Sequence, residues 1–151
     1  MVSTTLLAKS LDEQNDILTL FQGRVRERTA RVGVVGMGYV GLPIALLFAK
    51  KGFQTTGFDI DPAKIESLRQ GSSYIKHIPD SEIAREVQEN QFLPTADFSQ
   101  LSAMDAVIIC VPTPLDDHRE PDLSYIRATA ESIGSNLRRG QLVVLESTTY
   151  P

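Results

Sequence analysis

Three glycines carry the clearest chemical signal in this sequence. They form the pattern Gly-x-Gly-x-x-Gly as Gly36, Gly38 and Gly41, directly after an apolar segment. In a turn from strand to helix, the first glycine permits a tight bend, the second lets a pyrophosphate approach the backbone, and the third lets the helix pack on the strand. The free N–H groups at the helix start then face the anion, aided by the helix dipole. The pattern therefore predicts a site for the phosphates of a dinucleotide.

An acidic residue follows at the distance that such a site requires. Asp59 comes at the end of the predicted strand 53–58, where an aspartate accepts hydrogen bonds from the hydroxyls of an adenosine ribose. The same carboxylate repels a 2′-phosphate by about 4 kcal/mol at about 4 Å and an effective dielectric of about 20, before screening. Neither Ile60 nor Asp61 offers a compensating cation, so the sequence predicts NAD rather than NADP. The alternative is a solvated turn residue.

Hydroxyl groups follow two later apolar segments. Residues 111–114 read Val-Pro-Thr-Pro, and residues 147–149 read Ser-Thr-Thr. Ligands of doubly wound sheets bind outside the carboxyl ends of the strands. These hydroxyls could hydrogen-bond the pyrophosphate, the nicotinamide ribose or a catalytic water, and the equal alternative is that both segments are plain turns.

Other reactive side chains give weaker signals. Cys110 lies inside an apolar segment, which favours a buried packing thiol over a nucleophile. His77 and His118 fall in predicted loops, where surface positions are favoured over acid–base roles. Glu146 either faces the cleft or ends a strand. No metal-ligand spacing is present, so no metal site is expected.

The segments between these residues alternate between strand and helix. Such alternation predicts an α/β fold with a doubly wound parallel sheet of about five strands, the Rossmann arrangement. The predicted strands are 31–35, 53–58, 92–96, 106–111 and 141–146, and the predicted helices are 39–51, 61–70, 81–90 and 122–137.

Residues 1–30 differ from the remainder and are expected to form an N-terminal helical extension to a dinucleotide-binding domain of residues 31–151. A capping box at 10–13 predicts a helix from about 11 to 27. Its apolar residues recur in alternating steps of four and three, interrupted only by Gln14. They are Leu7, Leu11, Leu18, Phe21 and Val25. We favour a helix lying against its own domain; the same spacing fits a helix that pairs with a second copy, giving a homodimer.

Composition excludes several classes of function. The chain has 151 residues, 23% of them charged, and a net charge of −4. No run of Lys and Arg exceeds two residues, which argues against nucleic acid and anionic lipid as partners. The apolar runs 44–49 and 106–112 are far shorter than the roughly 20 residues of a spanning helix, and no secretory signal is present. With one cysteine as well, a cytoplasmic protein is expected.

Longer motifs resemble the N-terminal domain of the UDP-glucose/GDP-mannose dehydrogenase family. The resemblance spans residues 31–151 and is closest to the branch acting on UDP-N-acetylhexosamines, whereas residues 1–30 lie outside it. The motifs are VGVVGMGYVGLPIA (32–45), GFDIDPAKI (57–65), AVIICVPTPLDD (106–117), PDLSYI (121–126) and VVLESTTYP (143–151).

The resemblance implies oxidation of a sugar C6 alcohol to the acid with two NAD⁺ in succession, through a cysteine thioester. It also assigns roles at matching positions. The pyrophosphate turn is matched by Gly36, Gly38, Tyr39, Val40 and Gly41. Asp59 and Lys64 match the ribose pair. Thr113 matches a residue near the nicotinamide, and Thr148 matches a threonine that holds an active-site water and is the catalytic candidate. Val111 and Ser147, close before them in the sequence, are also expected to bind the cofactor.

The family's remaining catalytic residues and its sugar-nucleotide domain have no counterpart in this sequence, and Cys110 does not match the nucleophile. We therefore expect a truncated cofactor half that turns nothing over by itself, the UDP-sugar needing the missing domain. Two alternatives stay open. One is a non-catalytic NAD sensor, and the other is the cofactor domain of a β-hydroxyacid dehydrogenase.

Overall fold

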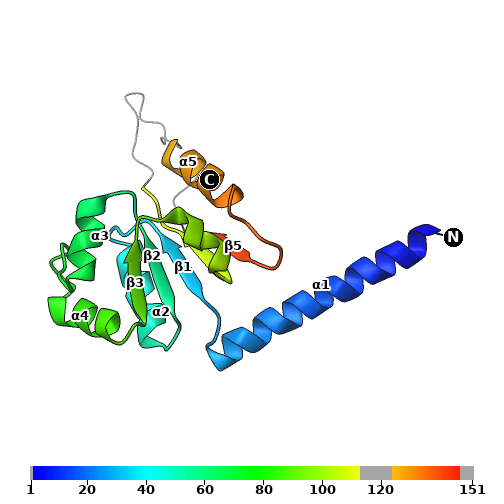
Figure 1. The fold of residues 1–151 in the computed structure, drawn as a ribbon, viewed down its shortest axis with the longest axis horizontal. Coiled ribbons are helices and arrows are strands. Elements are labelled where there is room, and N and C mark those ends of the chain that lie inside the picture. The colour runs from blue at the N-terminus through cyan, green and yellow to red at the C-terminus, as the bar shows by residue number, and fades with distance from the viewer. Residues whose placement is uncertain (1, 113–123, 147–151) are drawn as a thin grey trace.

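The chain folds around one five-stranded parallel sheet (Figure 1). The computed structural model describes the backbone of residues 2–112 and 124–146, with side chains for 15–112, 126, 127 and 129–146. The strand order is β3-β2-β1-β4-β5, and every neighbouring pair is parallel. The strands are β1 (Val32–Val35), β2 (Thr55–Phe58), β3 (Phe92–Thr95), β4 (Ala106–Ile109) and β5 (Leu142–Leu145). The predicted doubly wound Rossmann sheet is confirmed.

The central strands are buried on both faces, which explains their apolar, β-branched sequences. All four residues of β1 are buried, and Val32 lies in register with Thr55 of β2 and Ala106 of β4. β3 tolerates Pro94 because it is an edge strand, where a missing N–H breaks no ladder hydrogen bond. β5 forms the other edge.

Helices cover both faces of the sheet. Leucine and alanine side chains of α2 pack with residues of α3, α4 and the loop between them in one core cluster, and η1 and α5 contribute to a second cluster. The helices are α2 (Gly41–Lys50), α3 (Pro62–Arg69), α4 (Asp80–Gln88), the 3₁₀ helix η1 (Phe98–Ala103) and α5 (Ser124–Gly134). Asp61 starts α3 by accepting a hydrogen bond from the N–H of Ala63. η1 was not predicted.

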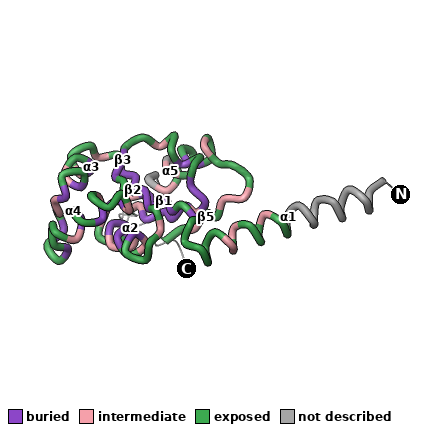
Figure 2. Tube along the Cα trace, turned by 60° about the horizontal axis from the view of Figure 1, so that its bottom comes forward, coloured by how far each residue is buried: buried purple, intermediate pink, exposed green. Residues whose placement is uncertain are grey.

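The N-terminal helix α1 (Val2–Glu27) differs from the prediction in two ways. It begins at Val2, so the predicted start at the Ser10–Glu13 capping box is wrong; Leu, Ala and Lys before Ser10 favour a continuing helix. It also projects away from the sheet instead of lying along it (Figure 1). Only its last turns reach the domain, and most of its described residues are exposed (Figure 2).

Across the described part of the chain, no helix combines the length and the apolarity needed to span a bilayer.

Candidate functional site

The glycine turn after β1 brings three glycines into three different environments. Gly36 has a φ of +94°, and a Cβ there would lie 2.7 Å from the carbonyl oxygen of Cys110. A Cβ on Gly41 would overlap the carbonyl oxygen of Gly36, whereas a Cβ on Gly38 would meet only open space. Gly36 and Gly41 are therefore required by packing, while Gly38 leaves room for a ligand against the backbone.

Backbone N–H groups of this turn are available to an anion. α2 starts after Val40, whose side chain makes no capping hydrogen bond. Among the described residues, no acceptor is within hydrogen-bond range of the N–H groups of Gly38, Tyr39 and Val40. Unpaired amides at the positive end of a helix form an anion site, so the geometry fits the pyrophosphate of a dinucleotide.

Asp59 connects this turn to the start of α3. Its carboxylate is buried, with 7% of the side chain exposed. Oδ2 accepts hydrogen bonds from the N–H of Met37 (2.8 Å) and from Nζ of Lys64 (3.1 Å), and Oδ1 accepts one from the N–H of Asp61 (2.9 Å). A carboxylate offers about four acceptor positions. One position on Oδ1 therefore remains for a ligand hydroxyl.

Tyr74, in the loop before α4, is a residue of the site that sequence reasoning missed. Its hydroxyl donates a 2.6 Å hydrogen bond to the carbonyl oxygen of Met37. Burial, and then the charges of Asp59 and Asp61, raise the pKa of Tyr74 well above its ordinary value, so the hydroxyl stays a neutral donor. No spacing rule links two residues 37 positions apart, so the sequence carried no signal for this contact.

A cleft of about 420 Å³ opens at the carboxyl ends of β1, β2 and β4. It brings together the predicted residues Gly36, Asp59, Lys64 and Val111. The strand order reverses between β1 and β4, and this is the switch point at which doubly wound sheets bind nucleotides. Residues that were not predicted to bind the coenzyme complete the lining: Val35, Phe58, Ile60, Asp61, Phe98, Pro112, Thr129 and Ser132.

The other residues singled out in the sequence do not line this cleft or lie outside the described residues. The ring of Tyr39 is exposed and stacks on His77, with centroids 6.4 Å apart. Cys110 is buried, and burial followed by the charge of Glu146 raises the pKa of its thiol to about 11, as suits a packing residue. Glu146 is exposed after β5, and its N–H bonds the carbonyl oxygen of Ile109. Thr113, His118, Ser147 and Thr148 lie outside the described residues.

Together, the sheet order, the open amides and the acid after β2 define a dinucleotide-binding Rossmann domain. Residues 30–151 match the NAD binding domain of the UDP-glucose/GDP-mannose dehydrogenase family. The chain belongs to this family, and its cofactor is NAD.

Individual relatives are similar over the same region. The UDP-N-acetyl-D-glucosamine 6-dehydrogenase of Pseudomonas aeruginosa is 42% identical over 121 residues, which are 80% of this chain and 28% of that protein. The UDP-N-acetyl-D-mannosamine dehydrogenase of Escherichia coli K12 is 37% identical over 120 residues, again 80% of this chain and 28% of that protein. The chain therefore spans between a quarter and a third of the length of these relatives.

Solved structures show the same likeness. The UDP-D-ManNAc dehydrogenase of Pyrococcus horikoshii superposes with a TM-score of 0.76 at 34% identity, covering 80% of this chain and 29% of that one. A ternary complex of GDP-mannose dehydrogenase from Pseudomonas aeruginosa gives a TM-score of 0.76 at 30% identity over the same shares. Both support the Rossmann fold and the family assignment.

Proposed function

We propose that this chain is the coenzyme-binding part of a nucleotide-sugar 6-dehydrogenase that oxidises the C6 alcohol of a UDP-N-acetylhexosamine to the carboxylate with two NAD⁺. The family and the names of the similar proteins support the class of reaction. One observation carries the coenzyme side of the proposal. The Asp59 carboxylate is held at the edge of the cleft beside the glycine turn, with one acceptor position left for a ribose hydroxyl.

Different residues of the cleft bind different parts of the coenzyme. The amides of the turn from Gly36 to Gly41 hold the pyrophosphate, and Asp59 with Lys64 holds the adenosine ribose. NAD⁺ supplies the hydride acceptor when it is bound. Three further positions extend the site toward the nicotinamide by resemblance alone. These are Thr113, Ser147 and Thr148, of which Thr148 is the proposed holder of the catalytic water.

The proposed division of the chain is an extension of residues 1–30 and a coenzyme domain of residues 31–151. Because the relatives are more than three times longer than the matched region, we propose that the sugar nucleotide and the thioester-forming cysteine belong to further domains. Cys110, buried and with a raised pKa, is unsuited to be that nucleophile. We also propose a cytoplasmic location, which fits a sequence whose one cysteine can form no internal disulfide.

The proposal is tested on the full product of the gene. NADH release is measured with a panel of sugar nucleotides: UDP-N-acetylglucosamine, UDP-N-acetylgalactosamine, UDP-N-acetylmannosamine, UDP-glucose and GDP-mannose. We expect a UDP-N-acetylhexosamine to be preferred, with two NADH formed for each sugar oxidised. The 151-residue chain alone is the control and should form none. One NADH per sugar, or none with any sugar nucleotide although NAD⁺ binds, would contradict the proposal.

A further inference from the structure

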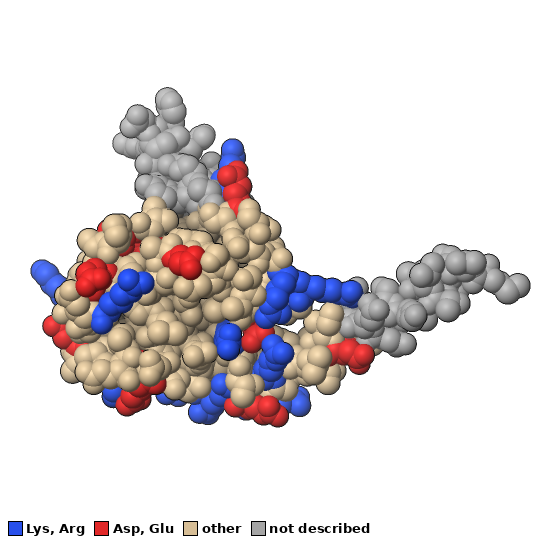
Figure 3. All heavy atoms as spheres, viewed as in Figure 1, with Lys and Arg blue, Asp and Glu red and all other residues tan. Residues whose placement is uncertain are grey.

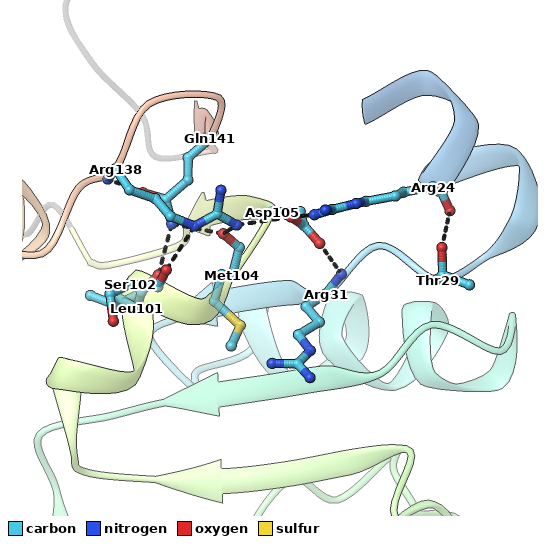
Figure 4. Close-up of polar contacts among 9 residues, drawn as sticks. All are labelled: Arg24, Thr29, Arg31, Leu101, Ser102, Met104, Asp105, Arg138 and Gln141. Carbon is cyan, nitrogen blue, oxygen red and sulfur yellow. Dashed lines mark hydrogen bonds and ion pairs between the residues drawn. The ribbon is translucent and has the colours of Figure 1, made fainter. Parts of the chain in front are cut away.

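Side-chain cations contribute little to the cleft beside the glycine turn. Among the described residues that line the cleft, Lys64 is the one lysine or arginine, and its Nζ is already bound to the Asp59 carboxylate at 3.1 Å. On the face seen in Figure 3, Lys and Arg gather instead where α1 meets the domain. There Arg24 and Arg138 bind Asp105 (Figure 4), which precedes β4 and therefore lies at the amino ends of the strands. An anion in the cleft therefore depends mainly on backbone N–H groups.

The backbone around Met37 has few steric restraints of its own. Gly36 lies directly before it and Gly38 directly after it, and a Cβ on Gly38 would meet nothing within 4 Å. The buried Met37 side chain fixes the Cα, but it leaves the peptide between Met37 and Gly38 free to rotate unless another group holds the carbonyl. Helix α2 does not hold this peptide, because its first backbone hydrogen bond in the described chain runs from the N–H of Leu42 to the carbonyl of Gly38 (3.1 Å).

Tyr74 supplies the missing restraint. Its hydroxyl donates a 2.6 Å hydrogen bond to the Met37 carbonyl oxygen. The C=O and the following N–H of a trans peptide point in opposite directions, so this bond turns the N–H of Gly38 away from Tyr74. On the other side of Met37, its own N–H donates to Asp59 at 2.8 Å. Both peptides of Met37 are therefore held by side chains from outside the turn.

The loop that carries Tyr74 is itself tied to the helices on both sides. The Ser67 hydroxyl of α3 donates to the carbonyl of Ser72 at 3.0 Å, and the backbone N–H of the residue before Tyr74 donates to Asp80 of α4 at 2.7 Å. Ile75, the next residue, is 2% exposed and belongs to the core cluster that contains the leucines of α2. Because the loop is fixed in this way, the Tyr74 hydroxyl can hold the turn rather than follow its movement.

Two further observations suit a supporting role for this loop. The ring of His77 stacks on Tyr39 with centroids 6.4 Å apart, so the loop meets the glycine turn at a second point. Burial, and then the charges of Asp59 and Asp61, raise the pKa of Tyr74, so its phenol keeps the proton that it donates. A neutral phenol donates one hydrogen bond, and here that bond goes to the turn.

We propose that Tyr74 is a positioning residue for the pyrophosphate of the coenzyme, because it holds the peptide between Met37 and Gly38 in the orientation that leaves the N–H groups of the turn open to the anion. Tyr74 acts through the turn and does not touch the coenzyme in this role. Without its hydroxyl, the peptide samples other orientations, and the coenzyme has to order it again on binding, which weakens affinity. The inference rests on the proposed coenzyme site and adds to it a residue outside the glycine motif.

Calorimetric titration of the full gene product with NAD⁺ tests this role. We expect the dissociation constant to rise about 5- to 10-fold in Tyr74→Phe, with folding verified by circular dichroism. Ser67→Ala is the matched control, because it also breaks one hydrogen bond from a hydroxyl to a backbone carbonyl, at the base of the same loop but outside the turn. It should change the constant less than about 2-fold. Equal constants in Tyr74→Phe and wild type, or equal increases in both variants, would overturn the inference.

Steady-state kinetics separate positioning from a general loss of structure. A partly unfolded enzyme has fewer active molecules, which lowers kcat but leaves the KM of the folded fraction unchanged. Tyr74→Phe should instead raise the KM for NAD⁺ about 5- to 10-fold and change kcat less than about 2-fold, since the turn holds the pyrophosphate equally before and during hydride transfer. A lower kcat with an unchanged KM would overturn the inference.

The two measurements also separate this inference from the proposed function. The titration needs no turnover, so it tests Tyr74 even if the proposed reaction fails. A wild type that binds NAD⁺ as tightly as Tyr74→Phe would overturn the positioning role alone, whereas a wild type that binds no NAD⁺ would overturn both.

Discussion

The backbone N–H of Met37 donates a 2.8 Å hydrogen bond to the carboxylate of Asp59. This contact joins the glycine turn after β1 to the acid after β2, so the two halves of the proposed coenzyme site are held as one unit. Lys64 binds the same carboxylate oxygen from the first turn of α3. The site is therefore preorganised, which lowers the conformational entropy lost on binding.

The first prediction separates the roles of two glycines. In Gly41→Ala the new methyl group meets the carbonyl oxygen of Gly36, so the free energy of unfolding should fall by about 2–3 kcal/mol. In Gly38→Ala the methyl group enters open space, so stability should change by less than about 1 kcal/mol while NAD⁺ binds about tenfold more weakly. Denaturant unfolding and coenzyme titration measure the two effects. Equal losses of stability in Gly41→Ala and Gly38→Ala would show that the two glycines do not have the different surroundings described above.

The second prediction concerns the phenol that supports the turn. Tyr74→Phe removes the donor to the Met37 carbonyl and should lower the free energy of unfolding by about 1 kcal/mol. Tyr39→Phe is the control. Its ring is exposed and stacked on His77, so loss of its hydroxyl should change stability by less than about 0.5 kcal/mol. Equal losses of unfolding free energy in the two variants would show that the hydrogen bond of Tyr74 does not stabilise the fold.

The third prediction concerns the buried carboxylate at the base of α1. Burial opposes ionisation of Asp105, but hydrogen bonds from the N–H of Arg31 and from Arg138, together with Arg24, hold the pKa of Asp105 below its ordinary value. Asp105→Asn should therefore cost about 2–4 kcal/mol of unfolding free energy at neutral pH. Asp16→Asn, exposed on α1, is the control and should cost less than about 0.5 kcal/mol.

The pH dependence of this difference has a definite sign. Because the pKa of Asp105 is lowered in the folded state, its contribution is fully present above the unfolded value of about 4 and is lost as pH falls through the folded value. The stability gap between wild type and Asp105→Asn should thus be largest near neutral pH and shrink below about pH 4. A gap that grew on acidification would show that the carboxylate is not stabilised as an anion.

The fourth prediction concerns the thiol. Burial raises the pKa of Cys110 to about 11, so little thiolate exists at neutral pH and access is restricted. Iodoacetamide should modify the folded chain at least about 100-fold more slowly than the denaturant-unfolded chain, with the rate rising as pH approaches 11. Rapid alkylation at neutral pH would indicate an open, activated cysteine instead.

The parts of the site that sequence could predict are those encoded locally. The glycine spacing indicates one strand-turn-helix unit, and Asp59 comes at the end of the strand that follows this unit. For the same reason the alternation of strands and helices predicted the sheet. Element boundaries shifted by a few residues because helix and strand ends depend on capping and on neighbouring strands.

The parts that sequence could not predict depend on contacts between distant segments. Tyr74 reaches Met37 only because the loop before α4 folds back over the glycine turn. Arg24 and Arg138 converge on Asp105 from α1 and from the turn before β5, which no local pattern relates. The capping box at 10–13 was misleading because helix propensity before Ser10 carries the helix through it.

The preference of the chain for NAD⁺ over NADP⁺, and its dependence on Asp59, test the proposed coenzyme site most directly. Calorimetric titration of the 151-residue chain should show NAD⁺ binding at least about 30-fold more tightly than NADP⁺, since the buried anion repels a 2′-phosphate. In Asp59→Asn, with folding verified by circular dichroism, the preference should fall below about 3-fold, while the exposed Asp16→Asn control keeps it. Equal affinities of the wild type for NAD⁺ and NADP⁺, or an unchanged preference in Asp59→Asn, would contradict the assignment of Asp59 to the adenosine ribose.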